Sequence, residues 1–418
     1  DMIIQRNTYV QNLIDRQHNG MIKVITGVRR CGKSFLLFNL FREYLENQGI
    51  SSDHIISIAL DDRMNRKLRD PDHLCEHVRS KIVGSGMFYI LLDEVQFVNE
   101  FEDVLNSFLH IPNADVYVTG SNARFLSKDV ITEFRGRGDE VRVFPLSFRE
   151  YLTVYEGTRE RALGEYMLYG GLPQVLSYKT EEQKTSYLKN LFAETYITDI
   201  KERYHIQRDE ELEELINIIS SSIGSLTNPN KLVNTFRTVK NVKIDQTTVK
   251  SYLDYLCDSF LVERAMRYDV KGRHYIDTPS KYYFTDLGLR NARLNFRQDE
   301  RTHIMENVVY NELRIRGFNV DVGIVPVTYT DANGARRKTQ LEIDFVCNLG
   351  SRRYYVQSAY HIDNDEKRLQ EQASLVKVND SFKKIIILGD DIPVQRNEQG
   401  ITTMSLMDFL CDAHSLDL

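Results

Sequence analysis

Residues 21–49 constrain the fold more than any other stretch, because they place a strand, a glycine-containing loop and a helix in direct succession. Residues 21–26 are apolar and rich in β-branched side chains, which is typical of a short buried strand. Residues 35–45 then carry apolar side chains at helical spacing. The loop between them fits the pattern G-x-x-x-x-G-K-[ST] through Gly27, Gly32, Lys33 and Ser34. This context predicts a phosphate-binding loop.

The chemistry of such a loop follows from its backbone. Glycines let main-chain N–H groups turn inward around phosphate oxygens, and the N-terminus of the next helix adds a positive dipole end. We expect Lys33 to reach the β- and γ-phosphates of ATP and Ser34 to bind Mg²⁺. The expected nucleotide contacts are Gly27, Val28, Arg29, Arg30, Cys31, Gly32, Lys33, Ser34 and Phe35. The alternative is a chance match in a loop that contains glycine.

A second acidic motif follows this loop. The apolar run FYILL at residues 88–92 ends in Asp93 and Glu94, which resembles a Walker B element. In that interpretation Asp93 holds Mg²⁺ through water, and Glu94 polarises the water that attacks the γ-phosphate. The alternative is a solvated pair of acids at the end of a strand.

Composition limits the class of protein. The 418 residues are enough for two to four domains, and the net charge of −6 restricts any nucleic-acid surface to a local patch. The five cysteines are scattered without a C-x-x-C pair, which favours a reducing compartment over a zinc or disulfide framework. No apolar run is long enough to span a bilayer. We therefore expect a cytoplasmic protein without membrane contact.

Five segments together resemble a large bacterial and archaeal family. In chain order they are GVRRCGKS, LLDEVQ, TGSNARFLS, RGRGDEVRVFPLSFREYL and YGGLP. They are similar to those of predicted AAA+-type ATPases that carry a C-terminal domain of unknown function. The resemblance covers nearly the whole chain and implies an ATPase core related to origin-recognition and STAND-type ATPases. It leaves the biological pathway open.

The resemblance also implies roles for residues outside the two motifs. Ser121 and Asn122 follow a buried strand where such ATPases keep sensor 1, which positions the lytic water. Arg135 and Arg137 are candidate arginine fingers for a neighbouring subunit, so we expect self-association through the nucleotide sites. Pro173, in GGLP, stands where a proline lies near the adenine. The alternatives are surface ion pairs for the arginines and a simple turn for the GGLP segment.

Patterning divides the α/β chain into four expected parts. Residues 1–146 form the P-loop ATPase core, and residues 147–204 form a helical lid over the nucleotide. Residues 205–299 read as three helices and two β-rich stretches around the tip KGRH, which describes a winged helix. Residues 300–418 form a further α/β domain.

The winged-helix region is locally basic. Residues 231–298 contain 13 Lys and Arg against 7 Asp and Glu. Such a local excess is the expected electrostatic footprint of phosphate contacts. The candidate DNA-binding residues are Lys243, Lys250, Lys271 and Arg273. The alternative is a module for packing or protein interaction, because fold does not fix function.

The last part has the element order of the PD-(D/E)xK nuclease fold, helix, three strands, helix and strand. Glu306 matches the helical glutamate of that fold, and Asp344 matches its metal-binding aspartate. Gln357 stands where Glu or Gln stands, with Glu342 two residues before the aspartate. Ala359 stands where a lysine is needed.

The missing lysine decides how this domain is interpreted. Its ammonium would lower the pKa of the attacking water and stabilise the phosphorane, and losing such a group costs roughly 10²–10³ in rate. Arg353 lies six residues from Ala359, about 20 Å along a strand, which is too far to replace it. We therefore expect a restriction-endonuclease-like domain that is inactive as a nuclease, yet able to bind nucleic acid or a protein partner.

Three functions remain open at this point. The first is an Mg-dependent ATPase coupled to DNA through the winged-helix and degenerate nuclease-like domains. The second is a STAND-like switch in which nucleotide gates association with a protein. The third is an ATP-regulated nuclease, against which Ala359 argues.

Overall fold

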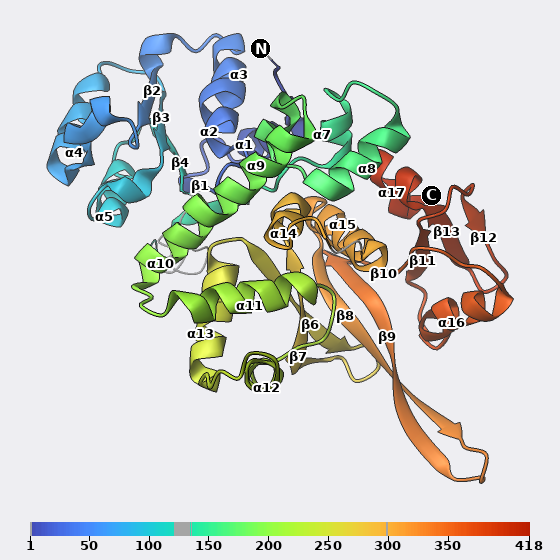
Figure 1. Ribbon diagram of the computed structural model, residues 1–418. Helices are drawn as coiled ribbons and strands as arrows, with labels where there is room; N and C mark the ends of the chain where they lie inside the picture. Colours follow the sequence, from blue (N-terminus) through green and yellow to red (C-terminus); the bar gives the residue numbers. More distant parts are fainter. Residues whose placement is uncertain (1, 121–133, 135, 298–299) are drawn as a thin grey trace.

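The computed structural model describes residues 2–120, 134, 136–297 and 300–418. These residues build two β-sheets with helices between and around them (Figure 1). A five-stranded sheet lies in the N-terminal part of the chain, and an eight-stranded sheet lies in the C-terminal part.

The first sheet is parallel throughout. Its strand order is β2-β3-β4-β1-β5, which places β1 between β4 and β5. The strands are β1 (Ile22–Thr26), β2 (Ile55–Ala59), β3 (Phe88–Asp93), β4 (Ala114–Thr119) and β5 (Gly138–Arg142). Because the strands are parallel, the loops after β1, β3 and β4 emerge at the same edge of the sheet. The predicted α/β class with a parallel sheet is confirmed.

Helices cover both faces of this sheet, as a parallel sheet requires. On one face Leu13 and Phe41 pack with Tyr117 of β4, and on the other Leu74 and Leu105 join Val24 of β1 in the apolar core. The helices are α1 (Asn7–Asp15), α2 (Lys33–Phe35), α3 (Arg42–Asn47), α4 (Pro71–Lys81) and α5 (Phe101–Phe108), with the π-turn η1 (Leu36–Phe41) and the short turns η2 (Ser52–His54), η3 (Arg63–Arg69) and η4 (Val95–Phe97).

A helical region follows the first sheet. Its elements are α7 (Phe148–Leu152), α8 (Arg159–Tyr169), η6 (Pro173–Ser177), α9 (Glu181–Leu191), η7 (Phe192–Ile197) and α10 (Thr198–Tyr204). The last three form one continuous helical run, seen in green in Figure 1. Capping boxes at Ser147 and Thr180 fix where α7 and α9 begin. Helical structure is thus present where the sequence predicts the lid.

Three more helices precede the second sheet, namely α11 (Asp209–Ser221), α12 (Pro229–Lys240) and α13 (Gln246–Asp258). The carboxylate of Asp245 caps α13 by accepting a hydrogen bond from the Thr247 N–H at 3.3 Å. The strands β6 (Val262–Asp269) and β7 (His274–Phe284) come next and pair in antiparallel fashion. This is the order expected of a winged helix, and the winged-helix assignment itself stays a prediction.

The second sheet is mixed, with the order β12-β13-β11-β10-β9-β8-β6-β7. Its other strands are β8 (Asn319–Thr330), β9 (Arg336–Leu349), β10 (Arg352–Ala359), β11 (Lys383–Leu388), β12 (Gln395–Arg396) and β13 (Ile401–Ser405). The accompanying helices are α14 (Leu287–Arg293), α15 (Arg301–Ile315), α16 (Asp365–Val376), α17 (Leu406–Cys411) and the turn η8 (Ser415–Asp417). The elements from α15 to β11 follow the expected order, and the nuclease-like assignment stays a prediction.

The sheet crosses the predicted boundary between residues 299 and 300. β6 pairs with β8 in parallel, with Arg267 opposite Val322 and Asp269 opposite Ile324. The hairpin expected to be the two-stranded wing therefore forms one edge of the C-terminal sheet. The domain boundaries remain predictions, but the two last parts share a sheet.

The ends of β8 and β9 leave the body of the molecule as a long two-stranded ribbon (Figure 1). Among the described residues, no helix is long and apolar enough to cross a membrane.

Candidate functional site

The loop after β1 has the backbone that its two glycines predict. Gly27 has φ +147° and Gly32 has φ +103°, both in the region that side chains disfavour. A Cβ on Gly27 would lie 2.2 Å from the carbonyl oxygen of Val143, just after β5. At Gly27 the loop therefore packs against the segment after β5 too closely for any residue but glycine.

Lys33 lies across this loop and is buried. Its Nζ donates hydrogen bonds to the carbonyl oxygens of Gly27 at 2.8 Å and Val28 at 3.0 Å. The ammonium is thus held at the mouth of the loop by neutral main-chain acceptors. It has no described carboxylate partner, so it can turn its charge to an anion.

Ser34 and Asp93 meet at the carboxyl edge of the sheet. The hydroxyl of Ser34 lies 2.8 Å from both carboxylate oxygens of Asp93. Thr119, the last residue of β4, donates to Oδ1 of Asp93 at 2.5 Å and accepts from the Glu94 N–H at 3.0 Å. Burial raises the pKa of Asp93, against the hydrogen bonds from Thr119 and Ser34, which lower it. A hydroxyl and a carboxylate in contact are oxygen ligands that suit Mg²⁺.

Thr119 was not among the residues predicted to act here, although it ends the strand beside the acidic motif. Its position at that strand end was the available signal. Glu94 follows Asp93 with φ +53° and accepts a hydrogen bond from the side-chain amide of Gln96. This left-handed turn directs the chain away from β3 immediately after the buried carboxylate.

A pocket of about 1180 Å³ opens beside these groups. It lies between the loop after β1, the segment after β3 and the helical run of α9 to α10. Its lining includes Arg29, Arg30, Gly32, Lys33, Ser34, Phe35, Glu94, Pro173, Tyr178, Tyr187 and Asp199. The pocket is large enough for a nucleotide, and Pro173 stands with two tyrosines at the side of the helical region.

Two contacts tie the helical region to the phosphate-binding loop. The guanidinium of Arg29 forms an ion pair with Asp199 of α10 at 2.7 Å. The hydroxyl of Tyr196 donates to the carbonyl oxygen of Arg29. Neither partner belongs to a local motif, and no sequence pattern indicates this pairing because the residues are far apart in the chain.

Arg6 supports the loop from the other side. Its buried guanidinium donates to the carbonyl oxygens of Cys31 at 2.8 Å and Phe144 at 2.7 Å. It also forms an ion pair with Glu150 of α7 at 2.9 Å. A single arginine before the first helix carries no recognisable motif, so this contact was also missed.

The expected sensor and finger residues are placed differently. Ser121, Asn122 and Arg135 lie outside the described residues. Arg137 is exposed just before β5, and its carbonyl oxygen accepts from the Ile22 N–H at 2.8 Å. This is the edge where β1 begins, opposite the edge that carries the phosphate-binding loop. Within one chain, therefore, Arg137 is not brought to the nucleotide pocket.

The candidate nuclease residues surround an unexpected lysine. Lys281 of β7 is buried, with its Nζ 3.2 Å from Glu306 of α15 and 2.5 Å from Glu342 of β9. Although burial lowers it, the charges of Glu306 and Glu342 raise the pKa of Lys281 above its usual value. An ammonium is thus brought to Glu306 and Glu342 by β7, a strand of the region predicted to be the winged helix.

The remaining residues of this group complete what we call the C-terminal cluster, namely Lys281, Glu306, Glu342, Asp344 and Gln357. Gln357 accepts a hydrogen bond from the Asp344 N–H at 2.9 Å, and the Asp344 carboxylate accepts from the Ser358 N–H at 2.8 Å. Burial and then the charge of Glu306 raise the pKa of Asp344 well above the usual carboxyl range.

Ala359 is buried in an apolar cluster. Within the described ranges, no group of three or more His, Cys, Asp or Glu side chains is arranged to hold a metal ion.

The four candidate DNA-binding residues lie in two places. Lys243 is exposed between α12 and α13, and Lys250 is exposed on α13. Lys271 and Arg273 are exposed at the turn between β6 and β7. There they line a pocket of about 630 Å³ together with Arg352 and Arg353, which sequence reasoning did not assign to DNA.

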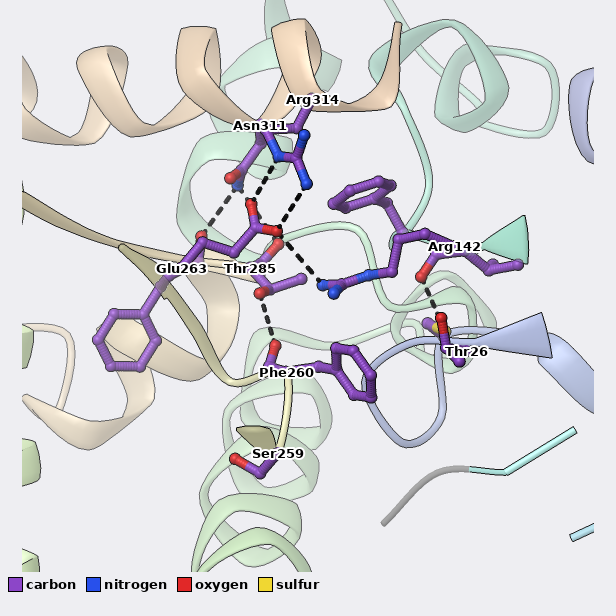
Figure 2. Close-up of polar contacts among 12 residues, drawn as sticks. Thr26, Arg142, Ser259, Phe260, Glu263, Thr285, Asn311 and Arg314 are labelled. Carbon is purple, nitrogen blue, oxygen red and sulfur yellow. Dashed lines mark hydrogen bonds and ion pairs between the residues drawn. The ribbon is translucent and has the colours of Figure 1, made fainter. Parts of the chain in front are cut away.

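A charged joint connects the two sheets, as Figure 2 shows. Arg142, the last residue of β5, extends toward Glu263 of β6 at 3.8 Å and lies over the ring of Phe260. Glu263 is also paired with Arg314 of α15 at 3.2 Å. Against the effect of burial, Arg314 and Arg142 hold the pKa of Glu263 below its usual value. Arg142 is opposite Thr26 in the sheet, the residue directly before the phosphate-binding loop.

Comparison with protein families matches two parts of the chain. A model described as an AAA domain matches residues 19–152. A second model, a domain of unknown function (DUF8612), matches residues 160–300, which include most of the expected lid and winged helix.

Whole-chain relatives extend the likeness. An uncharacterized protein of Haemophilus influenzae is 33% identical over 414 residues, which cover 98% of each chain. An uncharacterized protein of Methanocaldococcus jannaschii is 26% identical over 391 residues, covering 88% of this chain and 82% of its own.

Solved structures resemble the chain more distantly. The Aeropyrum pernix ORC1 protein in complex with DNA has 12% identity and a TM-score of 0.29, covering 71% of this chain and 93% of its own. The Saccharomyces cerevisiae Hsp104–ADP complex has 11% identity and a TM-score of 0.31, covering 76% of this chain and 43% of its own. At TM-scores below 0.5, neither likeness carries an argument about function.

Proposed function

The chain belongs to the family of the uncharacterized Haemophilus influenzae protein and carries an AAA domain, and from this premise we infer that it is an Mg²⁺-dependent ATPase. One observation carries the inference. Lys33 and Ser34 line one pocket that is large enough for a nucleotide, and the Asp93 carboxylate contacts the Ser34 hydroxyl at its edge. Each is the residue type that binding of Mg²⁺ and ATP requires at its position.

The roles of the residues follow from their surroundings. The N–H groups of the loop and the ammonium of Lys33 would bind the phosphates, with Lys33 leaving the carbonyls of Gly27 and Val28. Ser34 and Asp93 would hold Mg²⁺, which neutralises charge on the phosphates when it is bound. Glu94, beside the pocket, would orient the attacking water and accept its proton.

Pro173, Tyr178 and Tyr187 would contact the base. They line the pocket on the side of η6 and α9, and Pro173 lies against the loop, with its Cγ 3.7 Å from where a Cβ on Gly32 would stand. Aromatic rings and a proline offer the apolar surface that a nucleobase stacks on. The helical region would then act as a lid whose position depends on the bound nucleotide.

The proposal extends to DNA as the partner of the ATPase. Lys243, Lys250, Lys271 and Arg273 are exposed, and Arg352 and Arg353 add charge beside the last two. Exposed basic side chains are the usual source of sequence-independent affinity for phosphates.

The joint of Arg142, Glu263 and Arg314 supports coupling between these regions. It begins opposite the residue before the phosphate-binding loop and ends in the C-terminal sheet. A change of position at the loop would reach the sheet through contiguous, partly buried charges.

A STAND-like switch is the second candidate function. It is favoured by the contact of Arg29 with Asp199, which ties the helical region to the phosphate-binding loop. Such a contact would let nucleotide set the position of the lid, and the lid would gate association with a protein or with another copy of the chain. A role for Arg135 or Arg137 as a finger belongs to this self-association.

An ATP-regulated nuclease is the least supported candidate. Lys281 lies directly on Glu306 and Glu342, where a divalent cation would need those carboxylates. The lysine therefore supplies charge to the C-terminal cluster and at the same time competes with metal for it.

The test is the steady-state rate of Mg²⁺-dependent ATP hydrolysis, measured with and without single- and double-stranded DNA. Lys33→Ala should abolish turnover, while Lys377→Ala, an exposed lysine far from the pocket, should leave it unchanged. Stimulation by DNA supports the coupled ATPase, and slow turnover indifferent to DNA favours the switch. Turnover that survives in Lys33→Ala would refute both.

A further inference from the structure

The ribbon formed by β8 and β9 has no core of its own. Its outer part, residues 328–340, is called the arm. Thr328 pairs with Lys338, Tyr329 with Arg337 and Thr330 with Arg336. All its residues except Asp331 are exposed, and the arm projects well beyond the sheet (Figure 1). An isolated two-stranded hairpin is only marginally stable in water, so packing does not explain its length.

The turn at the tip is well ordered by its own hydrogen bonds. The Asp331 carboxylate accepts from the Asn333 and Ala335 N–H groups, both at 2.9 Å. The Asp331 N–H donates to the Ala335 carbonyl at 3.0 Å. The strand register of the arm is therefore maintained up to its tip, so the arm can present side chains at fixed positions.

The two faces of the arm differ in charge. Residues that pair across strands share a face, and side chains alternate along each strand. One face carries Arg336 and Lys338 with the hydroxyls of Thr328 and Thr330, and we call it the basic face. The other carries Tyr329 and Arg337. Arg337 is paired with Asp331, the only acid in the arm, at 3.0 Å.

Further basic side chains lie at the base of the arm. Lys271, at the turn between β6 and β7, donates its Nζ to the carbonyl oxygen of Pro326 at 2.8 Å, next to the arm. Arg273 follows two residues later in the same exposed turn. A basic surface thus extends from the body of the molecule onto the arm, in a chain whose net charge is −6.

The dimensions of the arm suit a groove. Its two strands lie about 4.8 Å apart and reach roughly 20 Å from the sheet, at about 3.3 Å per residue. The major groove of B-form DNA is about 12 Å wide and 8.5 Å deep and admits a two-stranded ribbon. The deep, narrow major groove of duplex RNA does not admit side chains in this way.

We propose that the arm binds double-stranded DNA by entering its major groove, with Arg336 and Lys338 directed at the phosphates that line the groove. The inference rests on the proposed contact of this chain with DNA and names the element that makes it. The basic face meets the DNA, and Arg337 lies on the opposite face, paired with Asp331.

The test is a titration of the full chain against labelled duplex DNA of about 30 base pairs, three helical turns, followed by fluorescence anisotropy. The double variant Arg336→Ala/Lys338→Ala should raise the Kd by roughly tenfold or more. It should also lower the slope of log K against log salt by about 2, measured between about 50 and 200 mM salt.

Two controls match this variant. Lys67→Ala/Lys377→Ala removes the same charge from exposed positions away from the arm, and Arg337→Ala changes the opposite face of the arm. Both should change the Kd less than about threefold, since they leave the groove contacts in place. The melting temperatures of all variants establish that each one is folded. Duplex RNA of the same sequence should bind more weakly than the DNA.

The outcomes separate this inference from the proposed function. If the native chain binds duplex DNA and the arm variant binds equally well, the arm inference is wrong and the DNA contact stands. The same holds if the distant charge control weakens binding as much as the arm variant does. If the native chain does not bind duplex DNA, both the DNA contact and the arm inference fail. A change in sedimentation of the arm variant without loss of DNA binding would make the arm a contact between copies, which also overturns the inference.

Discussion

The nucleotide pocket and the C-terminal cluster both place a buried lysine near buried carboxylates, but in opposite arrangements. In the pocket Lys33 is hydrogen-bonded to main-chain carbonyls, and Asp93 has hydroxyl partners in Ser34 and Thr119. In the cluster the ammonium of Lys281 lies directly on Glu306 and Glu342. In the pocket the positive and negative groups make no ion pair with each other, so both are open to a ligand. In the cluster the positive and negative groups already form ion pairs.

The acidic groups of the two sites reflect this difference. Burial raises the pKa of both Asp93 and Asp344. For Asp93 the next influences are hydrogen bonds from Thr119 and Ser34, which lower the pKa. For Asp344 the next influence is the charge of Glu306, which raises it further. The surroundings of Asp344 thus oppose ionisation more strongly than those of Asp93, whose hydroxyl partners favour it.

The largest expected effect comes from removing the lysine of the cluster. Lys281→Met leaves Glu306 and Glu342 without their cation and should lower the free energy of unfolding by about 3–5 kcal/mol. Millimolar MgCl₂ should restore part of this loss, since the carboxylates are then open to a metal. Urea unfolding with and without MgCl₂ measures both effects.

Lys23→Met is the matched control for that variant. Lys23 is equally buried and lies 2.5 Å from Asp115 in the first sheet, but it faces a single carboxylate. The free energy of unfolding should fall by a comparable amount in Lys23→Met, and MgCl₂ should not restore it. If the native protein is itself stabilised by MgCl₂ without nucleotide, the lysine does not fill the place of a metal and the comparison breaks.

The next effect concerns catalysis at the nucleotide pocket. Glu94→Gln removes the group proposed to accept the proton of water and should lower turnover roughly 10²–10³-fold, worth about 3–4 kcal/mol. ATP binding, followed by a fluorescent analogue, should persist. Glu342→Gln in the C-terminal cluster is the counterpart and should leave the basal rate unchanged. A fall in turnover in Glu342→Gln would show that the two sites are not separate.

A third test uses Asp286, which connects α14 to the segment before η6. It caps α14 and accepts from the Gly171 N–H at 2.8 Å. Burial raises its pKa to about 6, against backbone hydrogen bonds that lower it. Because the folded-state pKa lies above the unfolded value, this contribution to stability is present at low pH and is lost as pH rises through about 6.

The variant Asp286→Asn should escape that loss. Between pH 4 and pH 7 its stability should gain on that of the native chain by about 2 kcal/mol, at 1.4 kcal/mol per pKa unit. Urea unfolding of both chains at each pH gives the difference. A difference that does not change with pH would mean that Asp286 ionises as an ordinary carboxyl does.

The smallest effect sharpens the idea that charges in the pocket are exchangeable. Asp199→Ala removes the partner of Arg29, a half-exposed pair worth about 0–1 kcal/mol. The guanidinium is then free to meet phosphate, so ATP affinity should rise up to about fivefold. Glu398→Ala, an exposed acid far from the pocket, is the control. Weaker ATP binding in Asp199→Ala would indicate that the contact supports the bound state instead.

Local motifs explain how much of this could be predicted. Lys33 and Ser34 follow Gly27 and Gly32 at fixed spacing, and Asp93 ends an apolar strand, so chain-local patterns predicted residues that do meet in space. The order of strands and helices was also recognisable, because hydrophobic period and capping residues are local properties.

The rest depends on tertiary pairing. Lys281 reaches Glu342 because β7 and β9 belong to one sheet and α15 packs against it, and neither relation is written in the spacing of the residues. The nuclease motif places its lysine on the strand of Ala359, so it does not point to a lysine on β7. Arg6 and Asp199 likewise act through contacts with distant segments.

The pairing of β6 with β8 has a consequence for how such a chain can be inherited. A reading frame that stopped near residue 299 would leave β6 without β8 as its neighbour. A reading frame that began near residue 300 would expose the edge of β8 that pairs with β6. Bare strand edges promote association between chains. Recombination at this position would therefore yield two products that aggregate. The coding segments for the two halves are expected to be inherited together.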